Sequence, residues 1–367
     1  MKKNKVNKSN QDSRITHYSQ NSTDVMERRI MIAFALVLVA VFAVVIFGKA
    51  SGKLSNDVYS VKSDSLNSKY ATDKVSKPES EAPSENTDSA MDYSHSIICW
   101  GDSFSDNNAN STNFYTYYLS DFLNQRGADI DAVFSSGIEG DTVPVIAAKQ
   151  GGMPMLAQPF VIPAQTTSVE ISLKNNLGGA VLIQDKLNSG LNPCSIAGVE
   201  GTIDYRNGKL CFTRSKAGNE IKINTPTTVV TNAMKNIKDY TAVFFFGGDC
   251  TKYTPDELVF MYKEMIKFHN NDKYIIVGSI TGNEKKLAPY EQALSAEFKN
   301  HYINLREYLM TDVYNDYEIK ISTADAKALR AGSVPPTFIL NGKRLSDQGS
   351  GILADLLFDK LLQLEII

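Results

Sequence analysis

A short apolar run that ends in three small or polar residues constrains this chain most. Ile97 to Trp100 are apolar, Gly101-Asp102-Ser103 follow, and a polar loop comes next. A buried strand with such an end delivers its last residues to the edge of a sheet, where ligands bind in open α/β folds. We therefore expect Ser103 at the carboxyl end of a buried strand, with a functional site around it.

Strand and helix patterns alternate on both sides of a middle segment. Residues 254–257 are Thr-Pro-Asp-Glu, which combines a capping threonine, a proline at the first helical position and a glutamate three residues after the cap. Helices are predicted at 112–126, from the turn at 135–142 through 149, 254–269, 288–298 and 352–364, and strands at 97–101, 130–134, 242–246, 274–278 and 302–305. This order predicts an α/β fold with a mostly parallel sheet and helices on both faces.

The middle segment has a different pattern of apolar and turn-forming residues. Between residues 160 and 230, short apolar stretches are separated by Asn, Gly and Pro, which is typical of a small β-sandwich or barrel. We predict an inserted β domain at 156–231, and an α/β domain formed by 95–155 and 232–367.

The N-terminal part carries a membrane signal. Ile30 to Gly48 are uncharged, and their helix would be about 29 Å long, close to the roughly 30 Å of a bilayer core. Positive residues are denser before this span, so residues 1–29 are expected inside and the main domain outside. The alternative is a cleavable signal peptide, whose apolar region is usually about 7–15 residues long. Residues 49–94 are polar, contain few large apolar side chains, and are predicted to be a disordered linker.

Composition excludes some functions. The 367 residues carry a net charge of −3, which gives no reason to expect nucleic-acid binding. Four cysteines lack metal-type spacing, so no metal site and no cofactor are predicted. Buried thiols are expected, with a Cys194–Cys211 bridge as the alternative in an oxidising compartment.

Four ordered blocks carry a resemblance: Gly101-Asp102-Ser103, Gly137 to Thr142, Gly247-Gly248-Asp249, and Asn341 to Leu345. Over about residues 96–364 the chain resembles the SGNH (GDSL-type) hydrolase superfamily, serine esterases and lipases on a flavodoxin-like three-layer sandwich. It is also similar to a bacterial membrane-anchored subgroup with a β domain between the second and third blocks. The resemblance implies acyl transfer, with Ser103 as nucleophile and Gly140 as an oxyanion amide.

Three positions depart from the implied machinery. Asp249 stands at the oxyanion Asn position, Asn341 at the triad Asp position and Arg344 at the triad His position. Arginine stays protonated and cannot act as a general base. An ionised Asp249 cannot donate to an oxyanion. We predict an Asp249–Arg344 ion pair, with unrelated drift as the alternative.

Other residues near the blocks have two interpretations. Trp100, Asp102 and Gly248 are predicted to bind ligand, although a lone tryptophan at a strand end is more often part of a core. The chain has four histidines, and none is expected to reach Ser103: His17 on the cytoplasmic side, and His95, His269 and His301 at the opposite edge of the sheet. A Ser–Lys arrangement using Lys343 would need a desolvated lysine.

The predicted protein is a single-pass protein of a bacterial cell membrane, with its N-terminus inside and its main domain outside. Residues 30–48 contact the bilayer, and the expected ligand is an acylated glycan or another envelope ester or carbohydrate. The family activity is ester hydrolysis or deacetylation, but the site predicts a catalytically impaired member that binds glycan or acts as a scaffold. The alternatives are an active serine esterase with an unconventional base and a partner-binding protein with a relic pocket.

Overall fold

A five-stranded parallel sheet forms the centre of the structure. The computed structural model describes residues 95–106, 114–175, 179, 181, 190–248, 250–269 and 272–367. The sheet has the order β14-β13-β12-β1-β2. Its strands are β1 (Ile97–Gly101), β2 (Val133–Ser135), β12 (Thr241–Phe245), β13 (Tyr274–Val277) and β14 (Tyr302–Ile303). This is the flavodoxin-like order, and its switch point lies between β1 and β12, where ligands bind in such folds.

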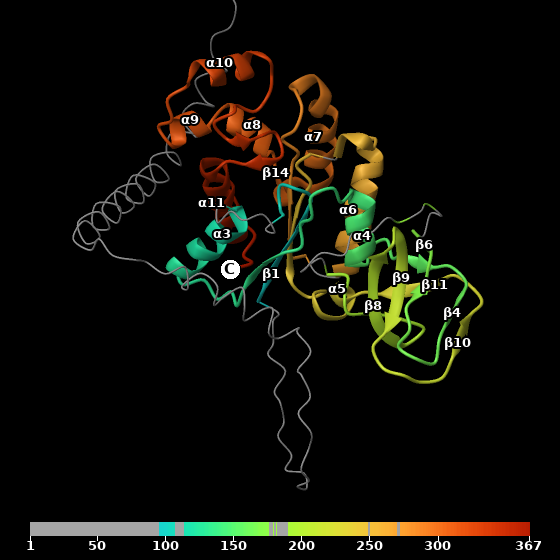
Figure 1. Cartoon of the computed structure of the whole chain (residues 1–367). Helices are drawn as coiled ribbons and strands as arrows, with labels where there is room; N and C mark the ends of the chain where they lie inside the picture. The colour runs from blue at the N-terminus through green and yellow to red at the C-terminus, as the bar shows by residue number, and fades with distance from the viewer. Residues whose placement is uncertain are drawn as a thin grey trace, which may run out of the picture. The chain divides into compact units, whose positions relative to one another are not determined.

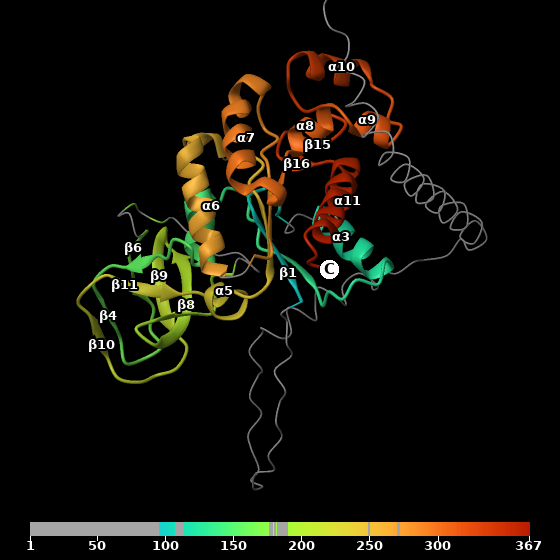
Figure 2. The ribbon, with the colours of Figure 1, turned by 180° about the vertical axis from the view of Figure 1, so that it is seen from behind.

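Helices cover both faces of this sheet, as predicted. On one side lie α3 (Tyr115–Gln125) and α11 (Asp347–Gln363), and on the other lie α4 (Val143–Gln150), α6 (Pro255–His269) and α7 (Glu284–Phe298) (Figures 1 and 2). Strand residues alternate between the two sides, so Cys99 packs with the first group and Trp100 with the second. Two separate apolar cores result.

The helix starts follow their capping residues. Glu257 accepts hydrogen bonds from the Thr254 amide at 2.8 Å and its hydroxyl at 3.0 Å, which confirms the predicted start of α6. Helix α11 begins at Asp347, earlier than predicted, because the Ser346 hydroxyl accepts from the Gly349 amide at 3.1 Å. The first residue of α11 is therefore set by the capping residue Ser346 and not by the periodic spacing of apolar residues.

Several short elements were not predicted. They are α5 (Asn232–Asn236), α8 (Leu305–Met310), α9 (Val313–Asp316), α10 (Thr323–Arg330), and a hairpin of β15 (Ile339–Leu340) and β16 (Arg344–Leu345). Each is too short to show a clear period in the sequence. Two of them, α8 and the hairpin, contribute to the cavities described below.

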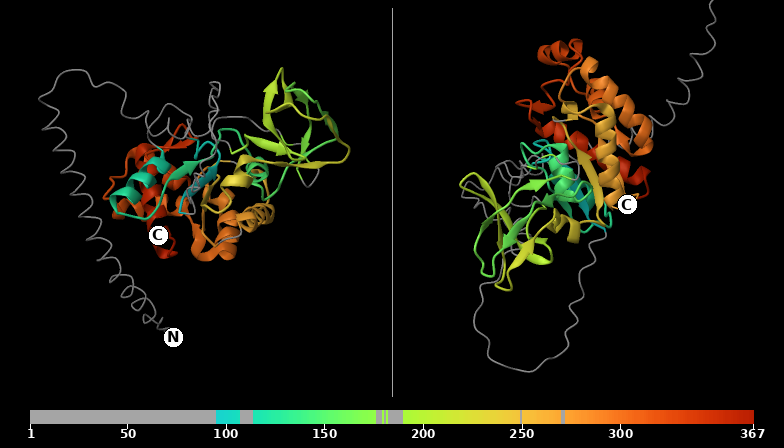
Figure 3. Two further views of the ribbon diagram at one scale, coloured as in Figure 1. Left: turned by 90° about the horizontal axis from the view of Figure 1, so that it is seen from below. Right: turned by 90° about the vertical axis from the view of Figure 1, so that its right-hand side faces the viewer.

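The segment between α4 and α5 is all antiparallel. Seven strands pair in the order β5-β9-β8-β7-β11-β3-β6, and β4 pairs with β10. Their bounds are β3 Leu156–Ala157, β4 Phe160–Ile162, β5 Val169–Glu170, β6 Leu173–Lys174, β7 Cys194–Ile196, β8 Val199–Arg206, β9 Lys209–Arg214, β10 Ile221–Ile223 and β11 Thr227–Val230. Figure 3 shows the long strands β8 and β9 side by side. These strands share an apolar core of their own, and a separate domain at 156–231 stays a prediction.

Arg214 holds one loop of this antiparallel part. Its buried guanidinium donates to the carbonyl oxygens of Lys216 at 2.7 Å, Pro163 at 2.8 Å and Asn219 at 2.9 Å. Arg214→Met is expected to lower the free energy of unfolding by about 1–3 kcal/mol, because these carbonyls lose their donor in a buried place. Urea unfolding at pH 7 measures this change.

Arg206→Met is the matched control for that experiment. Arg206 is half exposed and pairs with Asp204 and with no other described residue, so its replacement should lower stability much less than Arg214→Met, as is usual for surface ion pairs. Equal losses in the two variants would contradict a special role for Arg214.

The predicted span Ile30 to Gly48 and the linker after it lie outside the described residues. Among the residues that are described, no helix is long and apolar enough to cross a membrane. Cys99, Cys194, Cys211 and Cys250 are all buried, and none of them is in a disulfide. The alternative of a Cys194–Cys211 bridge is therefore wrong for this structure, and the buried-thiol interpretation holds.

Candidate active site

The loop after β1 carries Ser103 in the expected place, beyond the carboxyl end of this strand. Asp102 fixes this loop, because its carboxylate accepts from the Phe104 amide at 3.0 Å and from the Gly248 amide at 2.9 Å. Asp102 is 4% exposed. The carboxylate thus ties the loop after β1 to the loop after β12, and Gly248 contributes through its backbone amide.

Close packing of glycines brings the second block against the serine loop. A Cβ on Gly101 would lie 2.4 Å from the Phe245 carbonyl oxygen, and one on Gly137 would lie 2.2 Å from the backbone carbon of Ser105. Ser105 is itself anchored, since its hydroxyl lies 2.8 Å from the Tyr115 hydroxyl. Any side chain at either glycine would push the loops apart.

Asp106 makes the second link between these loops. Its carboxylate accepts from the Glu139 amide at 2.7 Å. The next residue, Gly140, is exposed and has φ of +93°, a backbone conformation that favours glycine. The predicted oxyanion residue is therefore at a turn tied to the serine loop.

A fully buried ion pair involves Asp141, the residue that follows this turn. Lys149 of α4 donates to the Asp141 carboxylate, and both side chains are at most 1% exposed. The Thr231 hydroxyl donates to the Lys149 carbonyl at 2.6 Å, so the start of α5 is joined to the end of α4. Asp141 follows Gly140 in the sequence and Lys149 lies in the last turn of α4, so the ion pair joins the second block to this helix.

The fourth block, Asn341 to Leu345, contains a hairpin turn. Asn341 and Gly342 have φ of +54° and +68°, and the Lys343 amide donates to the Leu340 carbonyl at 3.2 Å. Positive φ at both central residues is the type I′ geometry that Asn-Gly favours. Asn341 is exposed, and its side chain has no hydrogen bond to another described residue.

Arg344 and Lys343 meet the second block through Glu139. Lys343 donates to the Glu139 carboxylate at 2.9 Å, and the Arg344 guanidinium lies 3.7 Å from its other oxygen. The hydrogen bond and charge of Lys343 lower the pKa of Glu139, with a smaller contribution from Arg344. Asp249 lies outside the described residues, so its pairing with Arg344 stays a prediction.

Sequence reasoning assigned no role to Glu139, although it lies inside the second block. The negative charge of Glu139 complements the positive charges of Lys343 and Arg344, and this complementarity is the signal in the sequence that could have identified Glu139. Lys343 is 68% exposed and ion-paired, so it is not the desolvated lysine that a Ser–Lys base requires.

A cavity of about 80 Å³ lies between the hairpin, Phe104 and the start of α11, and we call it the Ser103 pocket because Phe104 follows Ser103, which does not itself line the cavity. Its walls combine apolar side chains with one cation and one carboxylate, and are formed by Phe104, Phe114, Leu340, Arg344, Leu345, Asp347 and Ser350. Tyr118 donates to Asp347, and burial raises the pKa of this tyrosine. The cavity offers apolar walls and a guanidinium to a small group. Among the described residues, no three His, Cys, Asp or Glu side chains are placed to hold a metal ion.

Trp100 is 1% exposed and packs in the core with α4 and α6. Its ring offers no face to a ligand in this structure. Trp100 is therefore a core residue in this structure, as the alternative interpretation expects, and its ring is not placed to bind a ligand.

The three described histidines contact residues near the amino ends of the strands. His95 precedes β1 and lies 3.3 Å from Asp129, His269 Nδ1 is 2.7 Å from the Lys238 carbonyl, and His301 Nδ1 is 2.9 Å from the Tyr274 carbonyl. Ser103 follows the carboxyl end of β1. No histidine of the described ranges is therefore placed to remove its proton.

His269 should make the stability of the protein depend on pH. Burial lowers its pKa to about 4, whereas an unfolded histidine titrates near 6.5. Below about pH 6.5 the unfolded chain binds a proton that the folded protein does not, so stability falls by about 3 kcal/mol on approaching pH 4. Urea unfolding at pH 7.5 and 4.5 should show this fall, and His269→Gln should reduce it. Identical pH slopes in both proteins would refute the assignment.

Comparisons with known proteins give weak similarity. No family model matches the chain, and no curated protein matches it. Two solved structures are similar: TesA, at 10% identity and TM-score 0.37, covers 72% of this chain and 97% of its own. A lipase/acylhydrolase from Enterococcus faecalis, at 13% identity and TM-score 0.37, covers 73% and 95%.

The strand order and the helices on both faces of the sheet show a mixed α/β fold with a parallel sheet of flavodoxin-like order.

Proposed function

We propose that this protein binds acylated glycans, or related envelope esters, at the Ser103 pocket with little or no turnover. The observation that carries the proposal is the charged cluster at the position of the catalytic base. Arg344 lines the cavity, pairs with Glu139 and cannot accept a proton. The described histidines are at the other edge of the sheet.

The proposed ligand follows from the contents of the pocket. A guanidinium donates hydrogen bonds to carbonyl and hydroxyl oxygens without being consumed. Apolar side chains of Phe104, Phe114 and Leu340 suit a small acyl group, and the cavity of about 80 Å³ limits its size to something like acetyl. We further propose that residues 30–48 anchor the chain in a bacterial cell membrane, with this pocket facing outward.

Hydrolysis and binding should be measured on the full-length protein in detergent. The substrates are a small acetyl ester and an acetylated oligosaccharide, and the control is Ser103→Ala. The expected result is hydrolysis no faster than in Ser103→Ala, together with binding of the acetylated oligosaccharide. Arg344→Ala should weaken binding about tenfold, as for a lost hydrogen bond from a charged group, and Arg330→Ala on exposed α10 should not.

Two outcomes would reject the proposal. Turnover above the Ser103→Ala background would identify an active esterase with an unconventional base. Absence of both turnover and oligosaccharide binding would leave a partner-binding protein whose pocket is a relic.

A further inference from the structure

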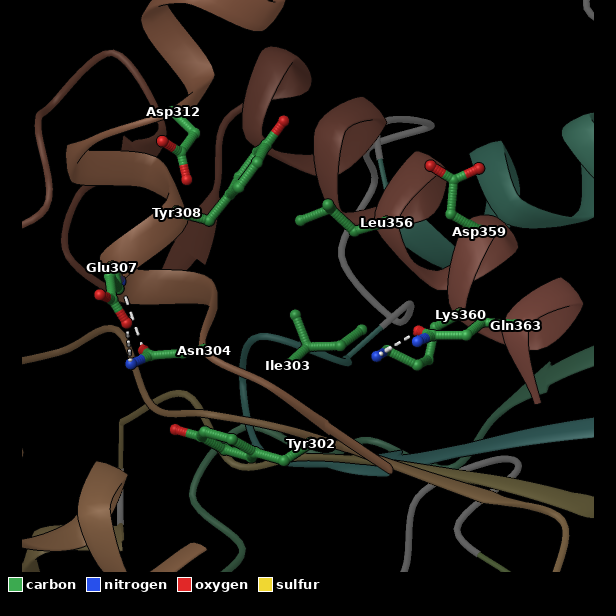
Figure 4. Close-up of a pocket in the computed structure, with 10 residues that line it drawn as sticks. All are labelled: Tyr302, Ile303, Asn304, Glu307, Tyr308, Asp312, Leu356, Asp359, Lys360 and Gln363. Carbon is green, nitrogen blue, oxygen red and sulfur yellow. Dashed lines mark hydrogen bonds between the residues drawn. The ribbon is translucent and has the colours of Figure 1, made fainter. Parts of the chain in front are cut away.

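A second and larger cavity lies beside the outer strand of the parallel sheet. It has a volume of about 350 Å³ and is formed by β14, α8 and α11 (Figure 4). It shares no lining residue with the Ser103 pocket. We propose that it binds a short linear zwitterion, such as a dipeptide with free ends or an ω-amino acid.

One wall of this cavity carries carboxylates. Asn304 caps α8, accepting from the Glu307 amide at 3.3 Å and donating to the Glu307 carboxylate at 2.9 Å. This arrangement holds the Glu307 carboxylate in place and leaves its other oxygen available. Asp312 lies on the same side (Figure 4), and its side chain makes no hydrogen bond or ion pair within the described part of the chain. Together they suit an ammonium group.

The opposite wall carries a cation. Lys360 on α11 donates to the Gln363 side chain at 2.8 Å, and the ammonium has three donors. Lys360 is half-buried and forms no ion pair with a described residue, and burial lowers its pKa. Asp359 is adjacent on the helix, but its carboxylate points away from Lys360 (Figure 4). A partly desolvated ammonium with one amide partner suits a ligand carboxylate.

Apolar surface separates the two walls. Ile303 and Leu356 lie between them, and the Tyr308 ring is held by a 2.7 Å hydrogen bond from its hydroxyl to Asp316 (Figure 4). A ligand whose ammonium and carboxylate groups are attached to the same carbon can contact one of the two walls but not both. A ligand with a short chain between its charges reaches both, and the volume lies within the usual range of about 300–1,000 Å³ for small-molecule sites.

Calorimetric titration of the full-length protein with 6-aminohexanoate tests this proposal. Hexylamine, hexanoate and alanine are the ligand controls, and alanyl-alanine is the peptide probe. We expect saturable binding of 6-aminohexanoate and alanyl-alanine, and at least tenfold weaker binding of the three controls. Hexanoate should be the weakest, because Glu307, Asp312 and Asp359 outnumber Lys360.

Variants then locate the site. Lys360→Met and Asp312→Asn should each weaken 6-aminohexanoate binding at least tenfold, while Lys285→Met, on exposed α7, and Ser103→Ala should not change it. No saturable binding to the wild-type protein would overturn the proposal, and so would binding that neither Lys360→Met nor Asp312→Asn weakens. The Ser103 pocket does not enter this experiment, so either proposal can fail alone.

Discussion

Ester hydrolysis is expected to rise by about 10²–10⁴-fold over the wild-type protein when Arg344→His, Asn341→Asp and Asp249→Asn are combined, because a general base typically contributes this much. Arg344 lines the same cavity as Phe104, which follows Ser103 in the chain, so a histidine at this position tests whether the hairpin can place a base against the serine. The Asn341→Asp change would keep the hairpin, since aspartate also tolerates the positive φ of this turn. The Asp249→Asn change would restore an uncharged donor at the oxyanion position.

Initial rates on a small acetyl ester measure this gain, with the same triple variant carrying Ser103→Ala as the control. The gain should vanish in that control. A triple variant that folds like the wild-type protein by circular dichroism, yet hydrolyses no faster, would mean that the loops are not arranged for acyl transfer. The hairpin would then match a catalytic block by its position in the sequence, but it would not provide the groups needed for catalysis.

Lys149→Met is expected to lower the free energy of unfolding by about 3–5 kcal/mol, because it leaves the Asp141 carboxylate buried without its cation. Both side chains of this pair are at most 1% exposed. Asp141 follows Gly140 in the sequence, so the same substitution should also loosen the second block. Urea unfolding at pH 7 measures the loss.

The matched control is Lys209→Met, whose partner Glu170 is exposed at the surface. Its effect on the free energy of unfolding should be much smaller than that of Lys149→Met, as for surface ion pairs. The double variant Lys149→Met/Asp141→Asn should recover part of the loss, because the unpaired carboxylate is gone. A Lys149→Met protein as stable as Lys209→Met would show that the pair contributes little.

The sequence predicted the parallel sheet well where the apolar pattern was local. Ile97 to Gly101 and Thr241 to Phe245 are continuous apolar runs that pair in the structure, and the capping residues before α6 identified its first residue. The position of Ser103 followed from these patterns. Strand ends and caps are encoded within a few residues, so they can be predicted one segment at a time.

The charged contacts of the site could not be predicted in the same way. Glu139 and Lys343 are 204 residues apart, and no local pattern reports a pairing over that distance. The hairpin is different, because Asn341-Gly342 is a turn signal in the sequence, although we interpret Asn341 from the sequence as a departure from a catalytic block. The second cavity depends on α8, which is too short to show a helical period.

Because the buried thiols are distributed among different apolar cores, thiol labelling can detect which core of the protein opens. Cys99, Cys250 and Cys194 are divided among the three apolar cores, and burial raises the pKa of Cys99 to about 12. An exposed thiolate attacks an electrophilic thiol reagent, so each cysteine should react only when its own core opens. Mass spectrometry of pulse-labelled protein would therefore report the order in which the two faces of the parallel sheet and the antiparallel strands come apart.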